Sequence, residues 1–152
     1  MAKQNQTPME TLQYDNYEFY NPNPMYKETP KSREKIWKRG DCVVRALCCA
    51  TDMRWSDVYR KIFLLALEVY DLPDSKIGMD HVLNHMGFAR LSFGKVKKGQ
   101  KRPKVHEIAE KFKDKICILD CGGHVLCTKH GCYYDTFDSG FMTVYSMYIK
   151  RV

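Results

Sequence analysis

The sequence predicts a single α+β domain in which helices precede an antiparallel sheet. Segments with helical spacing of apolar residues follow residue 40, and short runs rich in aliphatic and aromatic residues follow residue 115. This segregated order is typical of an α+β domain and disfavours a parallel doubly wound fold. With 152 residues, of which 44% are hydrophobic and 28% charged, the chain can build one hydrophobic core but not two linked domains.

We expect an extended N-terminal arm at residues 1–32 and the folded domain at residues 33–152. The arm contains Asn21-Pro22-Asn23-Pro24 and has no helical or alternating pattern. A disordered tail would be poor in aromatic residues, whereas this arm holds Tyr17, Phe19, Tyr20 and Tyr26. The segment Tyr17–Tyr26 is therefore expected to lie along the domain surface or a partner.

Four helices are expected after the arm. Asp41 is predicted to cap the first, Ser56 to cap the second, and Gly87 to end the third, because these residue types favour those positions. Leu72-Pro73 should stop the second helix. The expected segments are Cys42–Ala50, an amphipathic run from Ser56 to before Leu72, Met79–Met86 and Val105–Phe112.

Five strands are expected, each short and enriched in β-branched or aromatic residues. Gly94–Lys104, a lysine-rich segment after the first of them, should be a solvent-exposed loop. The expected strands are Phe88–Phe93, Ile116–Asp120, His124–Lys129, Cys132–Phe137 and Met142–Lys150.

Composition indicates a protein that stays inside the cell. The longest apolar run, Ile62–Leu67, is far shorter than the roughly 20 residues of a transmembrane helix. Met1–Glu10 is polar and does not resemble a secretory signal. An odd count of seven cysteines argues for reduced thiols. We expect a cytoplasmic location and no membrane partner.

Cys42 is the candidate nucleophile. It stands at the predicted start of a buried helix, where unpaired backbone N–H groups and the helix dipole favour a thiolate over a thiol. The same N–H groups can stabilise an oxyanion. Since Asp41 next to it opposes a thiolate, a second activating group is needed.

His124 and Asp135 complete the predicted catalytic site. If His130-Gly131 forms a two-residue hairpin loop, Leu126 pairs with Asp135, and Asp135 lies on the same face as His124. Asp138 would project to the other face. Asp135 is therefore predicted to orient His124, which activates Cys42, although a one-residue slip would reverse the choice of carboxylate.

Two stretches, GDCVVRALCCAT and GGHVLCTKHGCYYDTFDS, resemble the motifs of papain-like cysteine peptidases. The likeness is greatest to small members from bacteria and their phages, near the bacteriocin-processing and transglutaminase-like branches. It covers about Gly40–Tyr148 and implies a nucleophile helix packed on an antiparallel sheet that carries the base, with the order Cys, His, Asp. The resemblance implies a thiol hydrolase acting on a peptide, isopeptide or amide through a thioester, without a cofactor, in the host cytoplasm if the chain is phage-encoded.

One feature of that family is missing from the sequence. Papain-like enzymes carry Gln or Asn a few residues before the cysteine to complete the oxyanion hole, and Ile36–Arg39 contains no amide side chain. Trp37, Arg39 or backbone groups could substitute, or the arm could supply Asn21 or Asn23.

A different class of function is a catalytically weak or inactive papain-like scaffold that binds an acidic protein or nucleic acid. The net charge of +7 and the lysine loop would serve such a role, although no stacking aromatic residues interleave the loop and solubility alone explains the charge. A protein partner is preferred over nucleic acid.

Other cysteines and histidines have simpler interpretations. Cys48 and Cys49 fit a helix core. His81 and His85 have the spacing of half a metal site, but no acid is seen at a suggestive spacing, so a solvent-facing pair without metal is expected. A zinc-stabilised nucleic-acid module is the weakest alternative, since its ligand set lacks any CxxC pair. That set would be Cys117, Cys121, Cys127, Cys132, His124 and His130.

Overall fold

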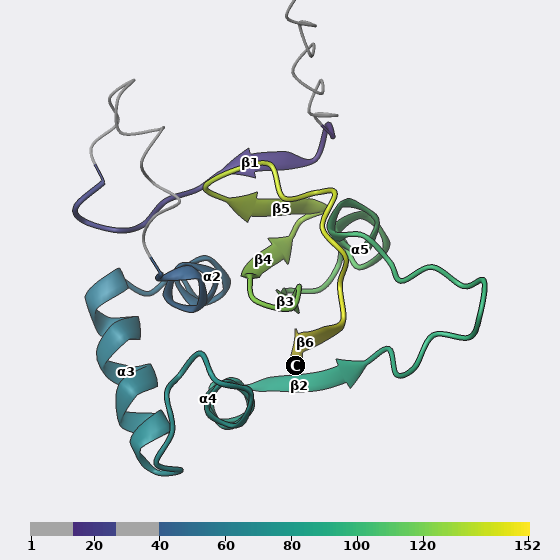
Figure 1. Cartoon of the computed structure of the whole chain (residues 1–152). Helices are drawn as coiled ribbons and strands as arrows, with labels where there is room; N and C mark the ends of the chain where they lie inside the picture. Colours follow the sequence, from purple (N-terminus) through teal and green to yellow (C-terminus); the bar gives the residue numbers. More distant parts are fainter. Residues whose placement is uncertain (1–13, 27–39) are drawn as a thin grey trace, which may run out of the picture.

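The computed structural model describes residues 14–26 and 40–152, which form four helices and one six-stranded mixed sheet (Figure 1). The helices are α2 (Cys42–Thr51), α3 (Trp55–Leu67), α4 (Lys76–His85) and α5 (Val105–Lys111). The strands are β1 (Tyr17–Phe19), β2 (Phe88–Ser92), β3 (Cys117–Asp120), β4 (Val125–Lys129), β5 (Cys132–Asp135) and β6 (Ser146–Lys150). The predicted α+β class is confirmed.

The sheet is mixed rather than wholly antiparallel, because the N-terminal arm contributes a strand. Its order is β1-β5-β4-β3-β6-β2, and β2 to β6 pair antiparallel wherever they are neighbours. At one edge β1 runs parallel to β5, with Tyr17 opposite Tyr133 and Phe19 opposite Asp135. The arm segment thus lies directly beside the strand that carries Asp135.

Helices cover both faces of the sheet, giving two hydrophobic cores. Figure 1 shows α2, α3 and α4 on one side and α5 on the other. Because successive strand residues point to opposite faces, Ile118 and Cys127 join the core with α2 to α4, whereas Leu119 and Leu126 join the core with α5. A buried α2 at the centre of this arrangement fixes the backbone at Cys42.

Several predicted boundaries were wrong by a few residues. Arg54, not Ser56, occupies the N-cap of α3. The third helix begins at Lys76, three residues before the expected Met79, because the Ser75 side chain accepts a hydrogen bond from the N–H of Gly78 at 3.0 Å and caps it. The last predicted strand, Met142–Lys150, is shorter in the structure, where β6 covers Ser146–Lys150.

Within residues 14–26 and 40–152, no helix is long and apolar enough to cross a bilayer. The lysine-rich segment between β2 and α5 is largely exposed, as predicted.

Candidate active site

Cys42 is the first residue of α2 and remains partly accessible to solvent. The eight residues after it, Val43–Ala50, are all buried, and the helix packs on β4. Asp41 occupies the N-cap position but makes no side-chain capping bond, which differs from the prediction. The carboxylate of Asp41 therefore leaves the first N–H groups of α2 without a side-chain acceptor.

The β4–β5 hairpin has the predicted register. His130 and Gly131 adopt φ values of 55° and 79°, as both central residues of a type I′ turn require. Lys129 lies opposite Cys132 and Cys127 opposite Tyr134, so the same register continued by one step sets Leu126 opposite Asp135. His124 immediately precedes β4, and its carbonyl accepts a hydrogen bond from the N–H of Cys121 at 2.9 Å.

The structure brings Cys42, His124 and Asp135 together. Nε2 of His124 lies 2.6 Å from Oδ2 of Asp135, and His124 is also hydrogen bonded to Cys42. Since Asp135 occupies Nε2, Nδ1 is the ring nitrogen left for the thiol. The ring of Phe137 packs against the imidazole with centroids 5.0 Å apart, and 14% of the His124 side chain is exposed.

The contacts around Cys42 and His124 favour an ion pair. Burial raises the pKa of Cys42, but hydrogen bonds from His124 and the N–H of Val125, with the charges of His124 and Arg45, lower it below its ordinary value overall. Burial lowers the pKa of His124, and the hydrogen bonds to Asp135 and Cys42 outweigh it and raise the pKa to about 9. Both shifts favour a thiolate beside an imidazolium over a neutral thiol beside a neutral imidazole.

Asp135 is buried and held by several donors. Its Oδ2 also accepts a hydrogen bond from Oγ of Ser139 at 2.6 Å, and its Oδ1 accepts from the N–H of Thr136 at 2.8 Å. The guanidinium of Arg45 lies 3.9 Å from Oδ1. These contacts fix the carboxylate that orients His124. Asp138, placed on the other face by the predicted register, accepts a hydrogen bond from Tyr133 instead.

Arg45 and Ser139 are site residues that sequence reasoning missed. Arg45 is buried between Asp41 and Asp135 and is ion paired with Asp41. Arg45 is the single charged residue in the apolar run VVRALCCA, and a charge buried there requires a partner of opposite charge. This pattern could have identified Arg45 from the sequence. Ser139 lies four residues after Asp135 in a turn and has no pattern that would identify it.

The side chain of Asp41 joins the arm and α3 to the start of α2. Its Oδ2 accepts hydrogen bonds from Nε1 of Trp55 and from Nδ2 of Asn23, both at 3.0 Å. The Asn23 amide, one of the candidates for the oxyanion hole, therefore bonds to the residue before Cys42. Oδ1 of Asn21 accepts from the N–H of Asn23 at 3.1 Å. The other candidates, within Ile36–Arg39, lie outside the described residues.

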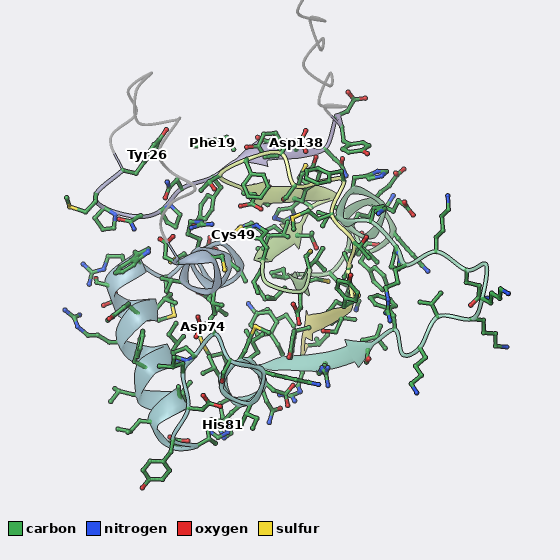
Figure 2. The ribbon with its side chains drawn as sticks, viewed as in Figure 1. Phe19, Tyr26, Cys49, Asp74, His81 and Asp138 are labelled. Atoms are coloured by element: carbon green, nitrogen blue, oxygen red, sulfur yellow. The ribbon has the colours of Figure 1, made fainter. Side chains whose placement is uncertain are left out.

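The remaining cysteines do not gather into a ligand set. Cys48 and Cys49 are buried in the core, as predicted, and Cys49 is hydrogen bonded to Cys127 across the α2–β4 contact. Figure 2 shows Cys49 on the sheet side of α2. Among the residues that the structure describes, no group of possible metal ligands includes the cysteines of the zinc alternative, and His124 contacts Cys42 and Asp135 instead.

A cleft of about 650 Å³ opens beside Cys42. Gly122 and Gly123 line it together with Cys42, and both glycines have positive φ, 71° and 113°. Charged side chains of both signs also line it, and the basic ones are the more numerous. The basic residues are Lys76, Arg90, Lys95 and Arg102, and the acidic ones are Asp74 and Asp120.

Outside the cleft, one group of side chains has the composition of a metal site. Glu68 lies beside His81 and His85, so the expectation of a histidine pair without an acid was wrong. Glu68 follows α3, thirteen residues before His81, and only the packing of α3 against α4 brings it near.

Comparisons of the chain with protein-family models, with curated proteins and with solved structures give no match. The papain-like resemblance therefore rests on the two sequence motifs and on the geometry of the three side chains.

Proposed function

We propose that this protein is a papain-like cysteine peptidase or amidase. The observation that carries the proposal is the chain of contacts from Cys42 to His124 to the buried Asp135, in which the pKa of the thiol is lowered and that of the imidazole raised. A nucleophile, a base bonded to it and a third group that orients the base are the parts that covalent acyl transfer needs.

In the proposed reaction, the Cys42 thiolate attacks the carbonyl carbon of an amide and forms a C–S bond. The C–N bond then breaks, and the His124 imidazolium gives its proton to the departing amine. Water next adds to the thioester while His124 takes one of its protons. The carboxylic acid leaves, and the His124 proton remains to restore the ion pair. If an amine replaces water, the same site transfers the acyl group.

The N-terminus of α2 supports the oxyanion in this proposal. Backbone N–H groups at a helix start carry partial positive charge and have no acceptor from the Asp41 side chain. They would stabilise the negative oxygen of the tetrahedral intermediate next to Cys42. Such a backbone site would function without the amide side chain that papain-like enzymes place upstream.

Selective alkylation of Cys42 tests the proposal. Iodoacetamide reacts with thiolates, so Cys42, whose pKa is lowered, should be labelled at neutral pH. Cys132 is a matched internal control: it is also partly exposed, but burial and the charge of Glu18 raise its pKa. Peptide mass spectrometry should show Cys42 labelled at least about tenfold faster than Cys132 at pH 7. Equal rates for the two thiols would contradict the proposal.

Hydrolysis should depend on pH differently from labelling. The pKa of His124 is raised to about 9, so His124 loses its proton above that pH and no longer protonates the leaving amine. Peptide turnover should therefore fall above about pH 9, while alkylation of Cys42 should not. A turnover rate that keeps rising beyond pH 10 would assign the acid role to another group.

The basic lining of the cleft favours a substrate with acidic residues near the scissile bond. Lys76, the first residue of α4, contributes to this lining. Lys76→Ala should raise KM for acidic peptides roughly two- to fivefold, the effect of one exposed ion pair worth up to about 1 kcal/mol, with kcat unchanged. A defined peptide mixture analysed by mass spectrometry measures the preference. Lys111→Ala, on α5 across the sheet, is the control, and an equal KM change in both variants would refute the assignment.

The same cleft also favours the second candidate, an inactive scaffold that binds an acidic protein. Its four basic side chains are the specific observation in favour. In that case Cys42→Ala would leave binding and biological effect intact, whereas reversing the charges of Lys97, Lys98 and Lys101 in the exposed loop would remove them.

A further inference from the structure

Glu68, His81 and His85 form a cluster where α3 and α4 end. Glu68 is the C-cap of α3, and the two histidines stand one turn apart in the second half of α4. One potential ligand atom from each residue lies within 4.8 Å of the other two. Figure 2 shows His81 on α4 near the last turn of α3. None of the three residues lines the cleft beside Cys42.

The spacing of these atoms suits one small metal ion. Ligands about 2.1 Å from a tetrahedral zinc ion lie about 3.4 Å from each other. Nε2 of His81 is 2.9 Å from Oε2 of Glu68, and the two imidazole rings have centroids 4.0 Å apart. Small rotations of side chains therefore bring the three atoms to ligand distances. The exposed fractions of Glu68 and His81 side chains, 56% and 21%, leave room for an ion to enter.

The orientation of His85 is the second observation. Its Nδ1 lies 2.9 Å from the carbonyl oxygen of His81, which can only accept a hydrogen bond. Nδ1 must therefore carry the hydrogen, and neutral His85 keeps its lone pair on Nε2. Metal-binding histidines usually donate their second ring N–H to a carbonyl or carboxylate in this way, which fixes both the tautomer and the ring.

The backbone adds to the attraction for a cation. Helix C-termini carry partial negative charge from unpaired carbonyl groups. Glu68 caps the end of α3, and His85 is the final residue of α4. Two such ends meet at the cluster, beside the full negative charge of the Glu68 carboxylate.

We propose that Glu68, His81 and His85 bind a divalent transition-metal ion of the zinc class, with water in the remaining position. Two imidazole ligands favour zinc over magnesium or calcium, which prefer oxygen. Binding replaces the hydrogen between His81 and Glu68 with the metal: a neutral His81 then carries its hydrogen on Nδ1, and a protonated His81 releases one proton to solvent. The site would join the ends of α3 and α4 without taking part in the chemistry at Cys42.

Calorimetric titration with zinc chloride tests this site in the full chain. We use the Cys42→Ala background so that the thiolate and His124 do not compete for zinc. One equivalent should bind, and His85→Ala should weaken the affinity at least tenfold, since loss of even an outer-shell partner costs about 10- to 100-fold. His130→Asn is the matched control, because it removes an exposed histidine from a turn where asparagine tolerates the positive φ.

Cobalt and thermal unfolding supply independent readouts. Cobalt(II) bound by the cluster should show no thiolate charge-transfer absorption, whereas cobalt bound by cysteines would show it. Zinc should raise the melting temperature of the Cys42→Ala protein, and Glu68→Gln should remove most of that rise. Circular dichroism verifies that the variants are folded. Absence of zinc binding, thiolate absorption with cobalt, or equal affinities for His85→Ala and its parent would overturn the proposal.

Discussion

Replacing His124 with alanine is expected to abolish turnover, with a fall of about 10³-fold or more in kcat for any peptide that the protein cleaves. The variant loses the hydrogen bond that lowers the pKa of Cys42, and it loses the group that we propose protonates the leaving amine. Iodoacetamide labelling of Cys42 at pH 7 should slow about tenfold or more, because a free thiol is only a few per cent ionised there.

Two further variants serve as controls for this prediction. Cys42→Ala should abolish turnover and remove the labelled peptide, while His130→Asn should preserve both rates, since His130 lies in the exposed turn at the far end of the hairpin. Should His124→Ala retain rapid Cys42 labelling and appreciable turnover, another group activates the thiol and the proposed pair is wrong.

Replacing Asp135 with alanine is expected to destabilise the protein as well as inactivate it. The change leaves Arg45, His124, Ser139 and the N–H of Thr136 without their shared acceptor. Removing one partner from a buried charged group costs about 3–5 kcal/mol, so the free energy of unfolding should fall by that amount. Urea unfolding followed by circular dichroism measures it. Asp114→Ala, at an exposed position, should change it by less than about 0.5 kcal/mol.

Asp135→Asn separates orientation from stability. The amide keeps the shape of the carboxylate but not its charge. It also replaces one acceptor oxygen with an NH₂ donor, which changes the hydrogen bond that His124 can make. Turnover should fall by up to about 10⁴-fold, as when the carboxylate of a comparable triad becomes an amide, with a smaller loss of stability than in the alanine variant. If Asp135→Asn retains full turnover and an unchanged pH profile, Asp135 supports the fold and does not orient the base.

The sequence predicted the site where local rules dominate. A two-residue turn of His130-Gly131 fixes the hairpin register, and the register fixes which carboxylate faces His124. The start of α2 followed from a turn residue before an apolar run. In each case the prediction involved residues close in the chain, so few alternatives competed.

Features that depend on long-range packing were missed. Glu68 meets His81 only because α3 and α4 pack together, and β1 joins the sheet through pairing with β5 more than a hundred residues later. Asp41 has the residue type of an N-cap, but its carboxylate forms an ion pair with the buried guanidinium of Arg45 and does not accept a hydrogen bond from the first N–H groups of α2. Ser56 does not cap α3 because the helix starts two residues earlier than such a cap predicts, at Trp55, whose indole donates a hydrogen bond to Asp41.

The positions of Cys42, His124 and Asp135 in the sequence determine when these side chains can meet during synthesis. Both edge strands also pair with strands that follow much later in the chain: β2 pairs with β6, and β1 pairs with β5. Cys42 leaves the ribosome well before His124 and Asp135, so a nascent chain carries the thiol without the groups that activate it. Such non-local pairing is slow to form. Cys42 and the imidazole that lowers its pKa can therefore meet only after β4 has been synthesised.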